Sequence, residues 1–141
     1  GYDCLGWRLP TEAEWVWAAR GAVEKNKESY AGGGTINTVA WYIENSKHST
    51  HEVCKKKENE LGLCDMSGNV QEWVWDRARA YTSKTVHNPT GGNQGSPRMA
   101  RGGAWNRFGK NLHLAIRKEY SYAFQSNDIG FRLVRNVQST D

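Results

Sequence analysis

The sequence has few cysteines, few prolines and no long apolar run. Its 141 residues include three prolines and three cysteines, Cys4, Cys54 and Cys64. The cysteine spacing includes no CxxC pair, which argues against the common zinc modules. No stretch stays apolar over the roughly 18 residues that a membrane-spanning helix needs. We therefore expect no membrane-spanning segment. Because no signal peptide precedes the first motif, we also expect a longer natural protein.

An odd number of cysteines leaves at least one thiol without a partner inside the chain. A bridge between Cys54 and Cys64 is compatible with the sequence, which alone cannot establish it. Ordinary buried or partly buried thiols are the simpler interpretation of all three.

Tryptophan and glycine are abundant, with seven and fifteen residues. This combination is typical of aromatic packing among loops and tight turns, and it argues against a helical bundle. The chain carries a net charge of +4. The basic residues are not clustered and no nucleic-acid-binding motif accompanies them, so we expect no nucleic-acid partner.

The clearest helix signal lies near the start, in the sequence RLPTEAEW. Thr11 and Glu14 have the spacing of a capping box, in which each side chain binds a free backbone N–H at a helix start. We expect a helix from Glu12 to about Arg20 that ends at Gly21, a common residue just beyond a helix.

A second motif, NELGLCDMSGNVQEWVWD, covers residues 59–76. Asp65–Asn69 is rich in turn-forming residues, and the β-branched and aromatic residues of 70–75 favour a strand. A turn of carbonyl oxygens followed by the carboxylate of Glu72 offers ligands suited to a hard cation.

The rest of the chain is organised around residues 101–135. This stretch opens with RGGAW and closes with the apolar-rich strand IGFRLV, in which Ile129, Phe131 and Leu133 alternate. Between these ends, aromatic residues mix with adaptable polar ones. That composition is typical of a recognition surface rather than of a core.

Together, GWRLPTEAEWVWAARG, NELGLCDMSGNVQEWVWD, RMARGGAW and DIGFRLVR resemble the formylglycine-generating enzyme and sulfatase-modifying-factor superfamily. The resemblance implies an α+β, C-type-lectin-like fold with short twisted antiparallel strands, one or two helices and much irregular loop. It implies that residues 1–141 form a single domain, the C-terminal part of a longer chain. We expect the following motif tryptophans to be mainly buried: Trp15, Trp41, Trp73, Trp75 and Trp105.

The enzymes of this superfamily oxidise a substrate cysteine with two copper-binding cysteines just after the RGG motif. Those positions fall at about Arg107 and Leu112, and no cysteine follows Cys64. The soft thiolate ligands that the reaction needs are therefore missing. We expect no copper and no such oxidase activity, although an oxidase relative remains the alternative.

The same resemblance implies a calcium ion at the turn of the second motif. Its ligands would be the backbone carbonyls of Asp65, Gly68 and Val70 and the carboxylate of Glu72. An empty, preformed turn is the competing expectation.

Within the superfamily's scaffold, the segment 101–135 is similar to the variable segment of proteins diversified by retroelements. The resemblance implies a non-catalytic surface protein, lipid-anchored through a region outside this sequence, that binds changing ligands. Ordinary loop divergence and a plain glycan-binding lectin are the alternatives. The side chains expected to contact ligand are Asn106, Arg107, Phe108, Lys110, Asn111, His113, Glu119, Tyr120, Tyr122, Phe124, Gln125, Asn127 and Asp128.

Overall fold

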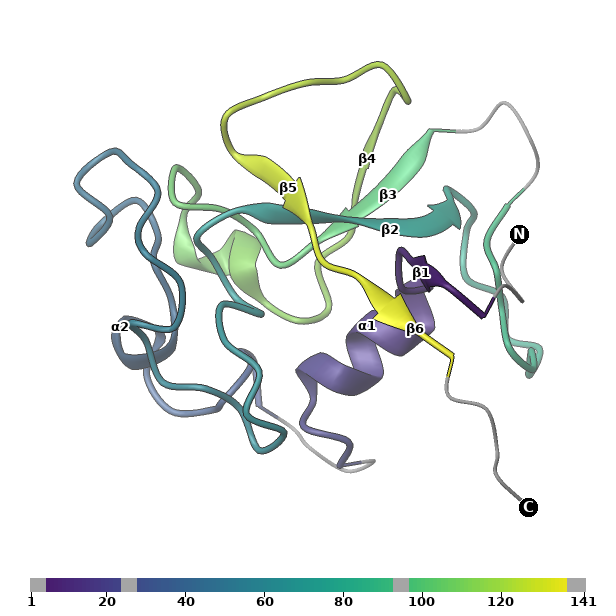
Figure 1. The fold of residues 1–141 in the computed structure, drawn as a ribbon, viewed down its shortest axis with the longest axis horizontal. Helices are drawn as coiled ribbons and strands as arrows, with labels where there is room; N and C mark the ends of the chain where they lie inside the picture. Colours follow the sequence, from purple (N-terminus) through teal and green to yellow (C-terminus); the bar gives the residue numbers. More distant parts are fainter. Residues whose placement is uncertain (1–4, 24–27, 93–96, 137–141) are drawn as a thin grey trace.

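A computed structural model describes residues 5–23, 28–92 and 97–136. Cys4 lies outside these ranges. Short helices and strands alternate with long irregular segments, which confirms the expected α+β class (Figure 1). In chain order the elements are β1 (Trp7–Arg8), α1 (Glu12–Ala19), α2 (Ile36–Val39), β2 (Gln71–Arg77), β3 (Arg98–Arg101), the 3-10 helix η1 (Gly109–Leu112), β4 (Lys118–Tyr120), β5 (Ile129–Phe131) and β6 (Val134–Arg135).

Helix α1 begins with the expected capping box. The Thr11 hydroxyl accepts a hydrogen bond from the Glu14 backbone N–H at 3.2 Å, and Glu14 Oε2 accepts one from the Thr11 N–H at 2.7 Å. The helix ends at Ala19, within one residue of the expected end. Gly21 follows with φ at +69°, a left-handed conformation that glycine adopts without steric cost.

The main sheet has the strand order β4-β3-β2-β5. β3 is antiparallel to both β2 and β4. β5 is parallel to β2, so the sheet is mixed, whereas the resemblance implied antiparallel strands. β4 and β5 therefore run in the same direction at opposite edges. Residues 121–128 must cross from one edge to the other, and Figure 1 shows this segment arching between them.

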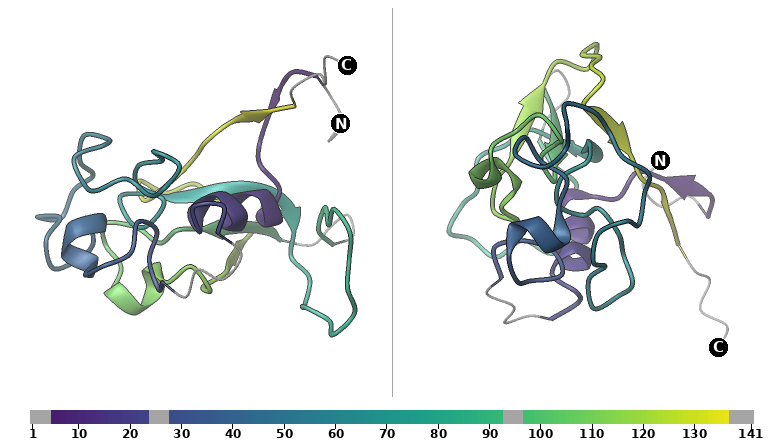
Figure 2. Two further views of the ribbon diagram at one scale, coloured as in Figure 1. Left: turned by 90° about the horizontal axis from the view of Figure 1, so that it is seen from below. Right: turned by 90° about the vertical axis from the view of Figure 1, so that its left-hand side faces the viewer.

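One face of the sheet is covered by α1, which lies along β2 in Figure 2. On this face, Trp15 packs with Val74 and Met99 in the main core cluster. The Trp15 indole N–H also donates to Glu72 Oε2 at 2.6 Å. Because side chains alternate along a strand, Trp73 points to the opposite face, which no helix of the described chain covers.

The expected burial of the motif tryptophans is complete only for Trp15, which is 1% exposed. The other four are half-buried: Trp41, Trp73, Trp75 and Trp105. The closing apolar stretch also differs from a single strand, because it is divided into β5 and β6. Between the two strands Arg132 turns inward to Glu72 and Leu133 is exposed, as is Phe131 at the end of β5.

Candidate functional site

The expected ligand contacts lie on two patches of the chain, residues 106–113 and residues 119–128. An ion pair joins them: Arg107 Nη2 lies 2.7 Å from Asp128 Oδ2. A second link is the Trp105 indole N–H, which donates to the Asn127 carbonyl at 3.4 Å. The structure therefore fixes the two patches to one another, although they are separate segments of the sequence.

The first patch, residues 106–113, is organised by η1. Phe108 is 59% exposed at the start of η1, and Lys110 is exposed on it. Together they line a hollow of about 540 Å³ that also includes Tyr30, Tyr42 and Glu44. We name this hollow the η1 hollow.

His113 is held beneath the first patch. One ring nitrogen lies 3.0 Å from the Tyr30 hydroxyl, and the two rings meet edge to face at 4.9 Å. Burial raises the pKa of the Tyr30 phenol. His113 therefore contacts a residue that lines the η1 hollow, and its half-buried ring offers little surface to a ligand.

The second patch, residues 119–128, is built on stacked rings. The Tyr120 and Phe124 rings stack with centroids 4.3 Å apart, and Tyr120 meets Trp73 edge to face at 5.9 Å. The Tyr120 hydroxyl donates to the buried Gln71 Oε1 at 3.1 Å. These contacts order the crossing segment and leave Tyr122, which is 81% exposed, projecting from it.

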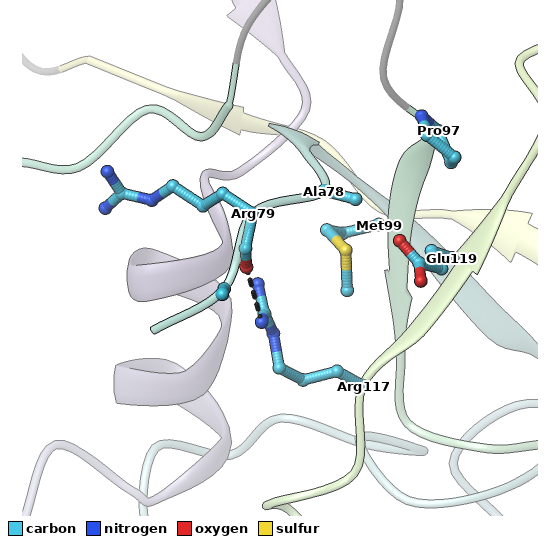
Figure 3. A pocket seen from close by; sticks show the side chains of 7 residues that line it. Ala78, Arg79, Pro97, Met99, Arg117 and Glu119 are labelled. Carbon is cyan, nitrogen blue, oxygen red and sulfur yellow. Dashed lines mark hydrogen bonds between the residues drawn. The ribbon is translucent and has the colours of Figure 1, made fainter. Parts of the chain in front are cut away.

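Glu119 does not belong with its neighbours. It pairs with Met99 in the sheet register, so it points to the face covered by α1. There it lines a separate hollow of about 450 Å³ with Arg79, Met99 and Arg117 (Figure 3). In that hollow the Arg117 guanidinium donates to the Arg79 carbonyl at 2.9 Å. Glu119 therefore lies on the opposite face of the sheet from Tyr120, because neighbouring strand residues face opposite sides.

The exposure of each candidate side chain shows which ones can reach a ligand and which ones pack within the protein. The exposed ones are Phe108, Lys110, Glu119, Tyr122, Gln125 and Asn127, and the half-buried ones are Asn106, Arg107, Asn111, His113, Tyr120 and Phe124. Asp128 is only 1% exposed. The expectation that Asp128 presents an adaptable contact is corrected, because its carboxylate is turned inward to hold Arg107.

Comparison with known proteins assigns the fold. The family model described as "Sulfatase-modifying factor enzyme 1-like domain" matches residues 3–137. The chain belongs to this family. Treponema denticola variable protein 1 has a similar structure, with a TM-score of 0.86 and 40% identity over 94% of this chain and 49% of its own. The expected resemblance to a variable protein on this scaffold is thereby confirmed.

Two proteins with similar sequences are named for different activities, one as a chaperone and one as an enzyme. The chaperone protein LppX of Paenibacillus barcinonensis is 31% identical over 93% of this chain and 50% of its own length. The formylglycine-generating enzyme of Streptomyces coelicolor is 29% identical over 96% of this chain and 48% of its own. The chain thus spans about half the length of these relatives.

The two positions where the sequence resemblance places the copper-binding cysteines, at about Arg107 and Leu112, have structural roles in this chain. Arg107 pairs with Asp128, and Leu112 is fully buried. A Cβ on Gly103, which has φ at +71°, would lie 2.7 Å from Leu112 Cγ. Glycine is therefore required where the RGG motif passes over Leu112.

The turn of the second motif offers calcium ligands of limited capacity. Both oxygens of Glu72 bind Arg132 at 2.6 Å, and Oε2 also accepts from Trp15. A carboxylate has about four lone-pair positions, so Oε1 keeps one for a cation. In the part of the chain that the structure describes, no three His, Cys, Asp or Glu side chains converge as metal ligands. A calcium ion here would depend mainly on backbone carbonyls.

Cys54 and Cys64 form a disulfide with Cα atoms 5.0 Å apart. The expectation of ordinary thiols is therefore wrong for this pair. The cause is the turn between them, where Asn59 Oδ1 accepts hydrogen bonds from the backbone N–H groups of Leu61 and Leu63. This reverses the chain and brings the two cysteines together.

Sequence reasoning missed Tyr30, Tyr42, Glu44 and Arg98, which line hollows beside the two patches. No local pattern marks them, because they are distant from residues 106–128 in sequence. Phe131 carried a usable signal. It lies between Gly130 and Arg132, so the alternation of side chains along a strand placed its ring on the face opposite the arginine.

No helix among the described residues has the length and apolar character needed to cross a membrane.

Proposed function

We propose that this chain is a non-catalytic binding protein whose ligand surface is formed by the exposed side chains of the two patches. The observation that carries the proposal is the Arg107–Asp128 pair, which fixes the exposed Phe108 and Tyr122 segments on one scaffold. Exposed aromatic rings provide large contact area at small conformational cost. The similarity to Treponema denticola variable protein 1 supports diversification of these positions.

We also propose that the protein is displayed on the cell surface and held there by an anchor outside this sequence. The disulfide between Cys54 and Cys64 supports it, since such bonds persist in oxidising compartments. We further propose a structural calcium ion at the 65–72 turn, held by carbonyls and the remaining lone pair of Glu72.

Sequencing the gene from many isolates tests the diversification. We expect exchanges concentrated at exposed positions such as Phe108, Lys110 and Tyr122. Buried Leu112 and Asp128 should stay constant in the same isolates. Exchanges spread evenly along the chain would contradict the proposal and favour ordinary loop divergence.

The oxidase alternative has a direct assay. Oxygen uptake with copper and a cysteine-containing peptide should not exceed that of a heat-denatured control. The physical reason is that Arg107 and Leu112 replace the thiolate pair, so no soft ligands are available at this place. Stoichiometric oxygen consumption would restore the enzyme reading.

A further inference from the structure

A third hollow lies on the sheet face opposite α1. It has a volume of about 340 Å³ and is lined by Leu9, Trp73, Arg98, Tyr122 and Phe131. We name it the aromatic hollow. Trp73 pairs directly with Phe131 in the parallel register of β2 and β5, and residues directly opposite each other share one face of a sheet. The floor of the hollow is therefore built from strands, which hold their side chains rigidly.

Two aromatic rings in the lining of the aromatic hollow are exposed to solvent. Tyr122 is 81% exposed and Phe131 is 64% exposed. Clustered exposed rings reduce solubility, and such clusters commonly mark binding sites. The volume is near the lower end of the roughly 300–1,000 Å³ typical of ligand pockets. It suits one large side chain better than an extended molecule.

Arg98 is the charged residue of this lining. Asp76 attracts it electrostatically, but no carboxylate of the described residues lies within ion-pair distance of its guanidinium. Its Nη1 donates to the Trp75 carbonyl at 2.7 Å, which fixes the guanidinium against β2. The carboxylates of Glu12, Glu14, Glu72 and Asp128 each pair with another arginine. Among the described residues, none forms an ion pair with Arg98. A guanidinium has five N–H donors, so several remain for an anion.

We propose that the aromatic hollow binds a protein ligand through one bulky apolar side chain with a carboxylate beside it. The rings take the apolar group, and Arg98 binds the carboxylate in the planar geometry that guanidinium favours. The inference rests on the proposed binding function and specifies part of its surface. Four of the five lining residues lie outside 106–128, so they form a constant part of the hollow, and Tyr122 is the lining residue that belongs to the diversified positions.

Two small probes test the chemistry without knowledge of the natural ligand. N-acetyl-L-tryptophanate carries both the ring and the carboxylate, while N-acetyl-L-tryptophanamide lacks the charge. Titration into the ¹⁵N-labelled chain should shift the resonances of Trp73, Arg98 and Phe131 with the acid. We expect the acid to bind at least about fivefold more tightly than the amide, about 1 kcal/mol.

Matched variants locate the effect. Arg98→Met should make the two probes bind equally, whereas Phe131→Ser should weaken both. Lys110→Met, in the η1 hollow, removes a charge elsewhere and should change neither. Because Arg98 also bonds to β2, Tyr122→Ser serves as a second variant at a fully solvated rim position, and it should weaken both probes.

Several outcomes would overturn the inference. They are equal affinity of acid and amide for the unmodified chain, shifts that map away from the hollow, binding of methyl mannoside at the same residues, and self-association that buries Phe131. The proposed function is tested separately. If isolates show no diversification but N-acetyl-L-tryptophanate binds in the aromatic hollow, the proposed diversified function fails and the inference on the hollow stands. If diversified variants bind selected proteins yet Arg98→Met leaves probe preference unchanged, only the hollow's assignment fails.

Discussion

Arg107 Nη2 and Asp128 Oδ2 lie 2.7 Å apart and join two segments that are separated by 21 residues. Asp128 is buried, while the Arg107 side chain is 39% exposed. One member of the pair is thus available for substitution and the other is not. Any exchange at position 107 that removes the positive charge leaves the buried Asp128 carboxylate without its cationic partner, with the hydrogen bonds from Ser126 and Asn106 left to stabilise its charge.

Arg107→Gln should therefore destabilise the fold by about 1–3 kcal/mol, the usual cost of an unsatisfied buried group. Asp128→Asn added to it should restore part of the loss, with a coupling of about 1 kcal/mol. Chemical denaturation of both single variants and the double variant measures this. Lys110→Gln, which removes an exposed charge nearby, should stay within about 0.5 kcal/mol of the parent. Additive single effects would contradict the pairing.

Tyr120 and Tyr122 are neighbours with opposite expected effects on stability. Tyr120→Ala removes the stack on Phe124 and leaves the buried Gln71 oxygen without its hydrogen bond, so we expect a loss of about 2–3 kcal/mol. Tyr122→Ala should change stability by less than about 0.5 kcal/mol because the ring is 81% exposed. Thermal unfolding of the two variants checks the difference. Similar losses in both would show that Tyr122 is packed rather than displayed.

Asp76 links acid stability to the start of α1. Its Oδ2 accepts the Glu12 backbone N–H at 2.7 Å, one of the N–H groups that a helix start leaves unpaired. Burial raises the pKa of Asp76, and this outweighs the opposing effect of the Glu12 N–H. The folded state therefore binds a proton more readily than the unfolded chain.

This raised pKa fixes the sign of the pH dependence. As pH rises from about 4, the ordinary aspartate pKa, through the folded-state pKa, the parent should lose stability relative to Asp76→Asn. The asparagine keeps an acceptor for the helix. Asp76→Ala removes it and should cost about 1–3 kcal/mol at pH 7. Denaturation curves at several pH values compare the three proteins. If the parent instead became more stable relative to Asp76→Asn as pH rises over this interval, the folded-state pKa of Asp76 would be lowered and not raised.

The disulfide closes a short loop of sequence separation 10. Reduction, or the double change Cys54→Ser and Cys64→Ser, should cost about 2–3 kcal/mol by chain entropy. Urea denaturation with and without reductant measures it. The double serine variant should show no further effect of reductant, which controls for Cys4.

Calcium binding is tested by calorimetric titration of chelator-treated protein. Stability should rise by about 2.7 kcal/mol at a calcium concentration of one hundred times Kd. Two variants break the same ion pair in different ways. Glu72→Gln should weaken calcium binding because it removes the single carboxylate of the site, whereas Arg132→Gln should preserve or strengthen binding because it frees lone pairs on Glu72. Unchanged affinity in Glu72→Gln, or no heat with the parent, would count against this site.

Local chemistry made α1 and β2 predictable. Thr11, Glu14 and Gly21 specify a helix and its ends by contacts within a few residues, and the β-branched and aromatic residues before Asp76 specify a strand. The four linear motifs also identified the fold. The arrangement of the site could not be predicted in this way, because it depends on contacts between distant segments. The parallel placement of β5 and the split of Glu119 from Tyr120 follow from strand register, and the inward turn of Arg132 follows from its contact with the distant Glu72.

The pairing of β1 with β6 has a consequence for how the protein is made. Trp7 lies opposite Arg135, and Arg8 lies opposite Val134, so the first strand has no partner until the last has been synthesised. At about 5–20 residues per second, translation separates the two by roughly 6–25 s. Pairings of such long range also form slowly after synthesis. The nascent chain therefore passes through an extended interval in which β1 has no strand partner, and its yield in a cell should depend on protection of that strand during the interval.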